Sequence, residues 1–424
     1  MALPQLKRFS LSAFCILLYM MQSIDGSAQF PPGTNVDESK VPPYVLPDPL
    51  VMSNAKKVKD TKEWNTIQRP YIYHLFEENV YGRYPTQPVT IHFKTRESSA
   101  NALNGIATRK QVRVYLHPTD TTVFTDVLIY LPNSYKTRAP IFLSMNFNGN
   151  ETVNKDPAIL PSQNETQINR GHVDSTRGTD AYWQIEDVIA RGYGVATAYY
   201  GDFEPDNKDG WKTGIRTTLK DLLKIEPEEW GALGAWAWGM SRIMDYLQQD
   251  ALIDAKRVVL MGHSRLGKAS LWAGASDARF AIVISNESGE GGAALSKRWF
   301  GETVKQINDQ FPHWFVAAYK NYNNNTDSLP VDQHMLLSLI APRPLYIASA
   351  EGDQWSDPKG EFLSAVNAGK VYALFGKKGL GTDIMPPVNH PVGNTIRYHI
   401  RSGKHAVTLY DWQQYLSFAE MQLK

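Results

Sequence analysis

The sequence predicts an α/β fold, with helices on both faces of a mostly parallel central sheet, and three observations lead to this prediction. Two early segments, 89–94 and 111–116, alternate apolar and polar residues as antiparallel strands do. Later apolar runs are more continuous, as in strands buried on both faces, and they lie at 125–131, 140–147, 194–200, 257–262, 280–285, 344–350 and 395–400. Helical patterns occur among these runs at 230–246, 266–275, 359–375 and from 411 onward. Strands and helices in this order form a three-layer sandwich.

The domain organisation follows from where the composition changes. We expect one catalytic domain at 61–424, because no repeat or composition shift divides this region. The preceding segment, 29–60, is rich in proline and is predicted to be an extended leader on the domain surface. Two long polar stretches, 148–190 and 290–335, are typical of functional loops inserted in a compact domain. No segment is typical of a dimerisation helix, so we expect a monomer.

The N-terminus has the order of a secretory signal peptide. Lys7 and Arg8 precede an apolar run at 11–21, and small residues follow as far as Ala28. The run is about half as long as a membrane-spanning helix requires, so we expect cleavage after residue 28; the alternative is a short retained anchor. The predicted location is secreted or periplasmic, with no membrane contact once 1–28 is removed.

Composition and charge exclude several classes of protein. Of the 424 residues, 42% are hydrophobic and 21% are charged, which excludes disorder and coiled coil. The 44 basic and 43 acidic residues nearly cancel, so there is no electrostatic reason to expect a nucleic-acid partner. The single cysteine, Cys15, lies in the predicted signal peptide. The mature chain would therefore have no disulfide framework, no zinc-thiolate site and no thiol nucleophile.

A candidate nucleophile follows the strand predicted at 257–262. The segment Gly-His-Ser-Arg-Leu-Gly, residues 262–267, joins that strand to the next predicted helix. A tight turn of this kind exposes the serine hydroxyl, and the helix N-terminus directs amide groups towards a developing oxyanion. The pattern departs from G-x-S-x-G because Leu266 stands at the second glycine position and Gly267 comes one place later. The segment alone leaves two interpretations open, a nucleophile at Ser264 or an ordinary turn with a serine cap.

The order of residues along the chain provides a second test. Hydrolases with a serine at such a turn place an acid and then a histidine further along the chain. His405 follows the last predicted strand and is the candidate general base. Two acids follow predicted strands, Glu287 after 280–285 and Asp353 after 344–350. The carboxyl ends of parallel strands are where open α/β sheets hold their sites, so either acid is placed to reach the histidine.

Four separate motifs then resemble those of one family. GHSRLGK, ESGEGGAALSKRWFGET, SAEGDQWSDPKGEF and GKHAVTLYDW are similar, in this order, to motifs of the bacterial glucuronoyl esterases, which are α/β-hydrolases of carbohydrate esterase family 15. The resemblance extends from about residue 80 to the C-terminus, and the family tolerates the shifted glycine. It implies an α/β-hydrolase fold with long loop insertions and an esterase without metal or cofactor. Its expected partners are glucuronoxylan and lignin-carbohydrate esters, because the family cleaves the bond between glucuronic acid and lignin alcohols.

The resemblance also implies a role for each site residue. It makes Ser264 the nucleophile and His405 the base, and Arg265 would help to hold the oxyanion with its side chain and backbone amide. Lys268, Glu302 and Trp355 would bind the sugar. The family carries its triad acid after either of two strands, and this chain has a carboxylate at both places. We favour Glu287 as the principal acid, with Asp353 as support or substitute.

Two other functions stay open. One is a broader carbohydrate esterase, such as one that removes acetyl groups from xylan, but such an enzyme does not need uronate-binding groups around the acyl side. The other is a carbohydrate-binding protein with a degenerate hydrolase fold, which predicts that a member of the triad is missing. The sequence contains every member.

Overall fold

The computed structural model describes residues 30–161 and 177–423, and residues 34–423 belong to one compact unit. The predicted signal peptide at 1–28 lies outside the described residues. Among the helices of the described part, none is long and apolar enough to cross a membrane.

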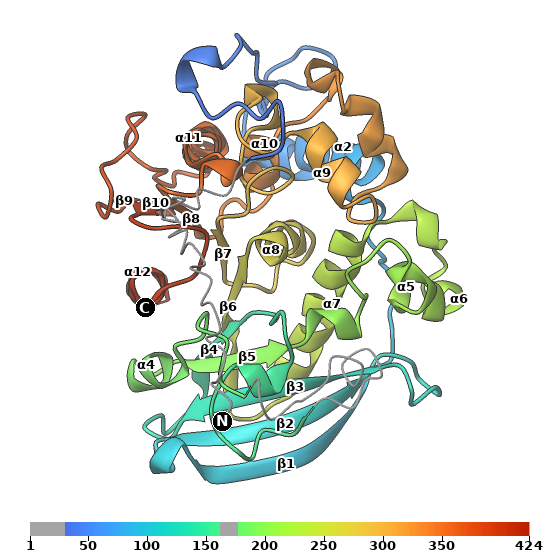
Figure 1. Ribbon diagram of the computed structural model, residues 1–424, viewed down its shortest axis with the longest axis vertical. Helices are drawn as coiled ribbons and strands as arrows, with labels where there is room; N and C mark the ends of the chain where they lie inside the picture. Colours follow the sequence, from blue (N-terminus) through green and yellow to red (C-terminus); the bar gives the residue numbers. More distant parts are fainter. Residues whose placement is uncertain (1–29, 162–176, 424) are drawn as a thin grey trace, which may run out of the picture. The chain divides into compact units, whose positions relative to one another are not determined.

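One twisted sheet organises the unit (Figure 1). Its strands follow the spatial order β1-β2-β3-β5-β4-β6-β7-β8-β10-β9. The first three pair antiparallel, and β3 also pairs antiparallel with β5. From β5 to β10 all neighbours are parallel, and the short β9 closes the edge antiparallel to β10. The strands are β1 (His92–Ala102), β2 (Ala107–Tyr115), β3 (Phe124–Pro132), β4 (Ala139–Leu143), β5 (Gly194–Ala198), β6 (Ile253–His263), β7 (Ile282–Asn286), β8 (Leu345–Ala350), β9 (Val392–Gly393) and β10 (Ile396–Arg401).

Helices cover both faces of the sheet, which confirms the predicted three-layer α/β-hydrolase architecture. In β6, Val258 and Leu260 join one hydrophobic cluster while Val259 and Met261 join the other, because successive side chains of a strand point to opposite faces. The first cluster includes residues of α2 (Arg69–Phe76), α7 (Ala232–Leu247), α8 (Arg265–Ser276), α10 (Gln333–Ser338) and α11 (Pro358–Leu374). The second includes residues of α4 (Ile185–Ala190) and α12 (Leu409–Gln422), which lie across the sheet from α7 and α8 in Figure 1.

Most predicted elements agree with the structure within a few residues, and the exceptions have physical reasons. The strand expected at 89–94 starts instead at His92 and continues to Ala102. The prediction missed these bounds because β1 is an exposed edge strand whose polar residues show little periodicity. A helical segment at 61–81, including α1 (Thr61–Glu63) and α2, was not expected. The remaining short helices are α5 (Ile215–Thr218), α6 (Lys220–Leu223) and α9 (Val304–Gln310).

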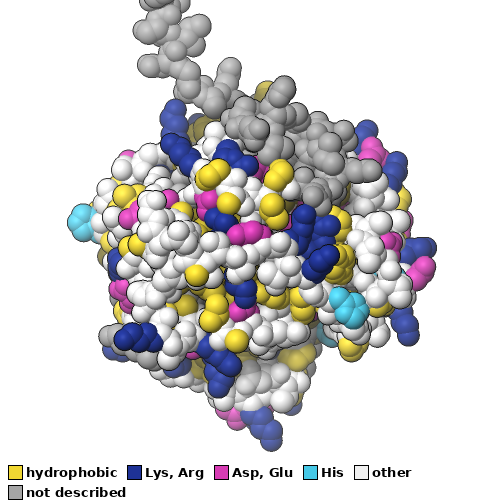
Figure 2. All heavy atoms as spheres, turned by 90° about the horizontal axis from the view of Figure 1, so that it is seen from below, with side chains coloured by type: hydrophobic (Ala, Val, Ile, Leu, Met, Phe, Trp, Pro, Cys, Tyr) yellow, Lys and Arg dark blue, Asp and Glu magenta, His cyan; other side chains and the backbone are white. Residues whose placement is uncertain are grey.

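Residues 34–60 contact the rest of this unit at several points. Gln68 donates from its side chain to the carbonyls of Pro49 and Val51, and Glu38 pairs with Arg298 and with Lys359. On the face drawn in Figure 2, basic and acidic side chains are interspersed, in keeping with the near-zero net charge.

Candidate active site

Ser264 occupies the sharp turn between β6 and α8. Its backbone has φ 55° and ψ −127°, a strained conformation for a residue with a side chain. A Cβ atom at Gly262 would lie 2.1 Å from the carbonyl oxygen of Leu266, so only glycine fits there. A Cβ atom at Gly267 would lie 3.0 Å from the Cβ of Ser288. The shifted glycine therefore permits α8 to pack against the loop after β7, while Leu266 is fully buried in the core.

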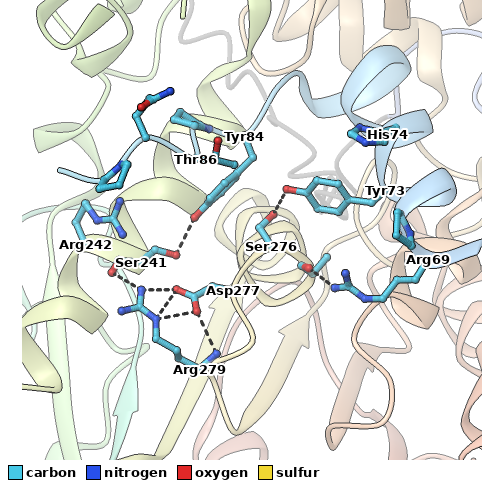
Figure 3. A pocket seen from close by; sticks show the side chains of 15 residues that line it. Arg69, Tyr73, His74, Tyr84, Thr86, Ser241, Arg242, Ser276, Asp277 and Arg279 are labelled. Carbon is cyan, nitrogen blue, oxygen red and sulfur yellow. Dashed lines mark hydrogen bonds and ion pairs between the residues drawn. The ribbon is translucent and has the colours of Figure 1, made fainter. Parts of the chain in front are cut away.

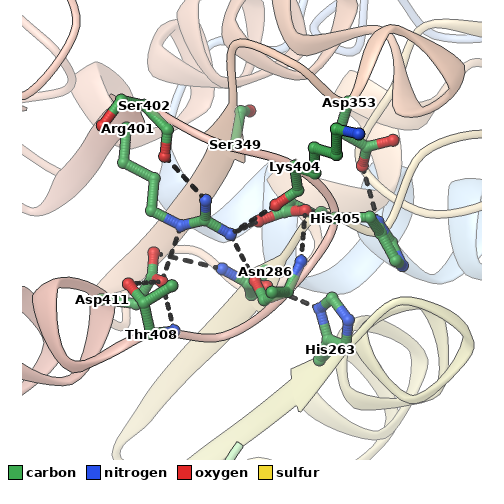
Figure 4. Close-up of polar contacts among 12 residues, drawn as sticks. His263, Asn286, Ser349, Asp353, Arg401, Ser402, Lys404, His405, Thr408 and Asp411 are labelled. Carbon is green, nitrogen blue, oxygen red and sulfur yellow. Dashed lines mark hydrogen bonds and ion pairs between the residues drawn. The ribbon is translucent and has the colours of Figure 1, made fainter. Parts of the chain in front are cut away.

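His405 lies between two loops that carry the candidate acids. Its Nδ1 is 2.6 Å from Oδ2 of Asp353 and 3.2 Å from Oε2 of Glu287. The loop after β8 and the loop after β10 meet closely, since the amide of Gly352 donates to the carbonyl of Gly403 over 2.9 Å. This contact brings Asp353 to the histidine, as the dashed line in Figure 4 shows. Both acids that the sequence nominated reach the same nitrogen.

Arg401 holds Glu287 in place. Its Nη2 donates to Oε1 of Glu287 at 2.6 Å. Its Nε donates to Oδ2 of Asp411 at 2.8 Å (Figure 4). The same guanidinium donates to the carbonyls of Lys404 and Ala406, on either side of His405. Arg401 and Glu287 are both buried, so their ion pair holds the loop that contains His405, residues 402–408, against the interior of the domain.

The electrostatics of the two acids differ. Burial tends to lower the pKa of His405, but its hydrogen bonds to Asp353 and Glu287 raise that pKa to about 9. Burial raises the pKa of Glu287 to about 7, against the opposing effects of His405 and Arg401. Burial also acts to raise the pKa of Asp353, but the hydrogen bond and the charge of His405, together with a hydrogen bond from Ser356, outweigh it and the net pKa is lowered. Asp353 is therefore the acid that stays ionised over the wider pH range.

A second histidine packs on the first. The rings of His263 and His405 lie with their centroids 4.4 Å apart and their planes 38° apart. Burial lowers the pKa of His263 to about 3, so its ring is neutral at pH 7. Its Nδ1 lies 2.6 Å from Oδ1 of Asn286, which can only accept, so Nδ1 carries the proton. Because His263 immediately precedes Ser264, the ring contact places His405 beside the serine turn.

Lys268, Glu302 and Trp355 come together near the candidate triad. Lys268 is buried in α8 and donates to the carbonyl of Ser288. The amide of Glu302 donates to the carbonyl of Trp355 at 2.9 Å. Burial raises the pKa of Glu302 to about 7, opposed by the charge of Lys268 and by a hydrogen bond from the Trp355 side chain. Glu302 therefore links the other two, through its charge interaction with Lys268 and its hydrogen bond with Trp355.

Arg265 follows the serine directly and is partly exposed. Its Nη1 donates to Oδ2 of Asp206, and its guanidinium carbon lies 5.0 Å from the centre of the Trp314 ring. The Nζ of Lys268 lies 5.8 Å from the centre of the same ring. Two cations thus flank one indole next to the candidate nucleophile.

Among the described residues, one group of side chains offers three ligand atoms that could surround a metal ion: Glu287, Asp353 and His405, whose atoms lie within 4.8 Å of one another. The 2.6 Å contact between Asp353 and His405 is a hydrogen bond, shorter than two ligands of one tetrahedral ion would stand apart at bond lengths of about 2.0–2.2 Å. This geometry is that of an acid orienting a base. The expected absence of a metal stays a prediction.

Comparison with known proteins identifies the family. A family model described as glucuronyl esterase of fungi matches residues 221–376. A carbohydrate esterase of an unknown prokaryotic organism is 47% identical over 400 residues, which cover 92% of each chain. The chain belongs to carbohydrate esterase family 15, since a solved member of that family is 45% identical to it and covers 92% of it. Members of this family, the glucuronoyl esterases, are carboxylic ester hydrolases, and this chain is one of them.

Solved structures agree with this family assignment. The glucuronoyl esterase from Solibacter usitatus superimposes with a TM-score of 0.87 at 50% identity, covering 91% of this chain and 100% of the other. A structure described as a promiscuous esterase of family 15 from a marine bacterial metagenome gives a TM-score of 0.84 at 45% identity, with coverage of 92% and 100%. The fold of this esterase is thus that of solved family members over nearly its whole length.

A hollow of about 520 Å³ lies elsewhere on this esterase, at the C-terminal end of α8 (Figure 3). Three pairs of its polar side chains bond to each other: Tyr84 to Ser241, Tyr73 to Ser276, and Arg279 to Asp277. None of the predicted site residues lines it. The hollow is therefore separate from the candidate active site.

Sequence reasoning gave no role to three residues of this site: Asp206, Arg401 and His263. Asp206 lies in the loop after β5, so the rule about carboxyl ends of parallel strands would have pointed to it. Arg401 ends β10, whose sequence Ile-Arg-Tyr-His-Ile-Arg alternates apolar and basic residues, so no local pattern distinguished Arg401 as the partner of a buried acid. His263 stands inside the quoted serine motif, but its contact with His405 depends on tertiary structure.

Proposed function

We propose that this esterase hydrolyses the ester between glucuronic acid side groups of glucuronoxylan, such as 4-O-methyl-glucuronoyl groups, and lignin alcohols. The observation that carries the proposal is the group formed by Lys268, Glu302 and Trp355 near the candidate triad. Lys268 and Glu302 interact with each other, and the charges of Asp353 and His405 act on Glu302, so the polar group adjoins the candidate triad. An esterase that removes acetyl groups has no use for such residues on the acyl side.

The proposed reaction begins at Ser264. With Nδ1 of His405 donating to Asp353, Nε2 is the nitrogen free to accept the serine proton as Oγ attacks the ester carbonyl. The N-terminal amides of α8 and the Arg265 guanidinium stabilise the oxyanion. His405 then returns the proton to the leaving alcohol, which departs and leaves the glucuronoyl group on Ser264. Water activated by the same histidine hydrolyses this acyl-enzyme and frees glucuronate.

Both acids serve the histidine in this proposal. Asp353 makes the shorter contact and orients His405, while Glu287 lies at 3.2 Å and links the imidazole to Arg401. The sequence favoured Glu287 as the principal acid, and the choice between the two stays a prediction that kinetics can decide. No cofactor enters the mechanism.

We also propose that the protein acts as a monomer outside the cytoplasm, secreted or periplasmic. The signal-peptide pattern at 1–28 supports this location.

A second candidate function has one observation in its favour. The marine family member at 45% identity is described as promiscuous, so a broader carbohydrate esterase is the alternative. The experiment that separates the two compares kcat/KM on benzyl glucuronate with kcat/KM on an acetylated xyloside. We expect a large preference for the glucuronate ester, at least about 100-fold, since each well-placed polar contact contributes about tenfold or more. Comparable rates on both esters would favour the broader function.

A further inference from the structure

We propose that Asp206 is a positioning residue that fixes the Arg265 guanidinium beside Ser264. The inference rests on the oxyanion role proposed above for Arg265 and adds the group through which that role is achieved. It starts from the convergence of four donors on one carboxylate. Arg265 and the Tyr200 hydroxyl reach Oδ2, while Nε2 of His313 and Nε1 of Trp314 reach Oδ1 at 2.8 and 2.7 Å.

The carboxylate is buried and ionised. Only 8% of the Asp206 side chain is exposed. Burial acts to raise the pKa of Asp206, but the hydrogen bond from His313, the charge of Arg265 and the other donors outweigh it and lower that pKa to about 2. An ionised carboxylate accepts only, so His313 and Trp314 both donate to it. Because donors contact both of its oxygens, the carboxylate of Asp206 is held in one orientation.

The two ring donors are themselves anchored. The first amides of α7 donate to their carbonyls: Ala232 to His313 at 2.9 Å and Leu233 to Trp314 at 3.2 Å. A Cβ atom at Gly231 would lie 2.1 Å from the carbonyl oxygen of Trp314, so the backbones meet without a gap. The loop that contains His313 and Trp314 therefore cannot shift without disturbing the buried helix α7, and this loop holds Asp206.

Arg265 is then held both at its edge and on its face. Asp206 bonds to Nη1, and the guanidinium carbon lies 5.0 Å from the Trp314 ring centre and 5.6 Å from that of Phe311. The two rings stack on each other at 3.8 Å, with planes 5° apart. An unrestrained arginine side chain loses rotamer freedom when it is fixed in one position. Here the fold fixes it beforehand, which is the condition for effective electrostatic stabilisation of a transition state.

A double-mutant cycle tests the inference. We expect Asp206→Asn to lower kcat/KM on benzyl glucuronate about tenfold in the wild-type background, mainly through kcat, because the guanidinium loses its fixed position. In the Arg265→Ala background the same substitution should change kcat/KM less than twofold, since it would act through a side chain that is no longer present. Equal factors in both backgrounds, or no effect in the wild type, would overturn the inference.

Matched variants keep the test independent of folding and of the proposed function. Glu204 lies two residues before Asp206 and forms a buried ion pair with Arg216. Glu204→Gln breaks this pair, so we expect a lower Tm. Its effect on kcat/KM should be the same with and without the Arg265 side chain. Trp314→Phe keeps a ring beside Arg265 but removes the Nε1 donor. We expect it to lower kcat/KM by a smaller factor, and this loss should also vanish in the Arg265→Ala background.

If Arg265→Ala alone did not change kcat/KM on benzyl glucuronate or p-nitrophenyl acetate, the oxyanion role of Arg265 would fail. If Arg265→Ala reduced the rate but Asp206→Asn remained multiplicative, only the positioning role would fail.

Discussion

Oδ2 of Asp353 lies 2.6 Å from Nδ1 of His405, and this contact sets the pH range in which the histidine is a base. The two acids raise the pKa of His405 to about 9. A general base must be neutral, so we expect kcat/KM to rise with pH and to level off above about pH 9. Asp353→Asn should move this inflection to lower pH because it removes one negative charge. A pH profile of kcat/KM on benzyl glucuronate measures both; an unchanged inflection in the variant would contradict the account.

The interaction of Asp353 with His405 also affects stability: activity should rise with pH, whereas the contribution of His405 to stability should fall with pH. The pKa of His405 in the folded state lies above its ordinary value of 6.5, so protonation of His405 favours folding. This contribution is complete below about pH 6.5 and is lost as pH rises through about 9. We expect the difference in Tm between wild type and His405→Ala to shrink over this window. A Tm difference that is constant from pH 6 to pH 10 would show that the interaction of His405 with Asp353 does not contribute to stability.

Substitution of the two acids separates their roles. Asp353→Asn should reduce kcat/KM about 100-fold, less than the roughly 10⁴-fold loss when a triad has a single acid, because Glu287 remains. Glu287→Gln should cost less activity but more stability, about 3 kcal/mol, because it leaves Arg401 buried beside a neutral group. Chemical denaturation and kinetics on both variants test this order. Near-full turnover in Asp353→Asn, with most activity lost in Glu287→Gln, would reverse it.

The strained backbone of Ser264 predicts a trade between activity and stability. A left-handed, non-glycine conformation costs about 1–3 kcal/mol, and glycine avoids that cost at the expense of about 0.5–1 kcal/mol of chain entropy. We therefore expect Ser264→Gly to be about 1 kcal/mol more stable than Ser264→Ala, with both variants inactive. Equilibrium unfolding of the two variants checks this, and equal stabilities would mean that the turn stores no strain.

His263 provides a further test of how the base is held. His263→Phe keeps a ring against His405 but removes the hydrogen bond to Asn286, whose buried oxygen then lacks a partner. We expect a loss of about 1–3 kcal/mol in unfolding free energy. His263→Ala should in addition lower kcat, because His405 loses the surface on which it packs. If His263→Ala turned over as fast as His263→Phe, the ring contact would have no part in positioning the base.

Much of the fold was readable from the sequence because buried strands and helices carry strong periodic signals. Continuous apolar runs such as 257–262 and 344–350 marked central strands, and β6 and β8 stand there. The polar edge strand β1 gave a weak signal, since its side chains are mostly exposed and obey no pattern. The helical segment at 61–81 was missed although it carries local signals at both ends: Asp60 caps its start by accepting from the amide of Glu63, and Gly82 ends it with φ 86°.

The site was predictable to the extent that it lies in local motifs. Ser264, His405 and both acids follow strands, and chain order connected them. The groups that hold them were not predictable: Arg401 contacts Glu287 across 114 residues and Asp206 contacts Arg265 across 59. Pairings at such separations are set by sheet topology, which the sequence does not display.

The central claim is that Ser264 is the nucleophile of this esterase. Intact-mass and peptide-mapping analysis after treatment with a fluorophosphonate tests it most directly. We predict a single adduct on Ser264 in the wild type, no adduct in Ser264→Ala, and parallel loss of benzyl glucuronate hydrolysis. An active wild-type enzyme that carries no adduct, or carries it on another residue, would contradict the account.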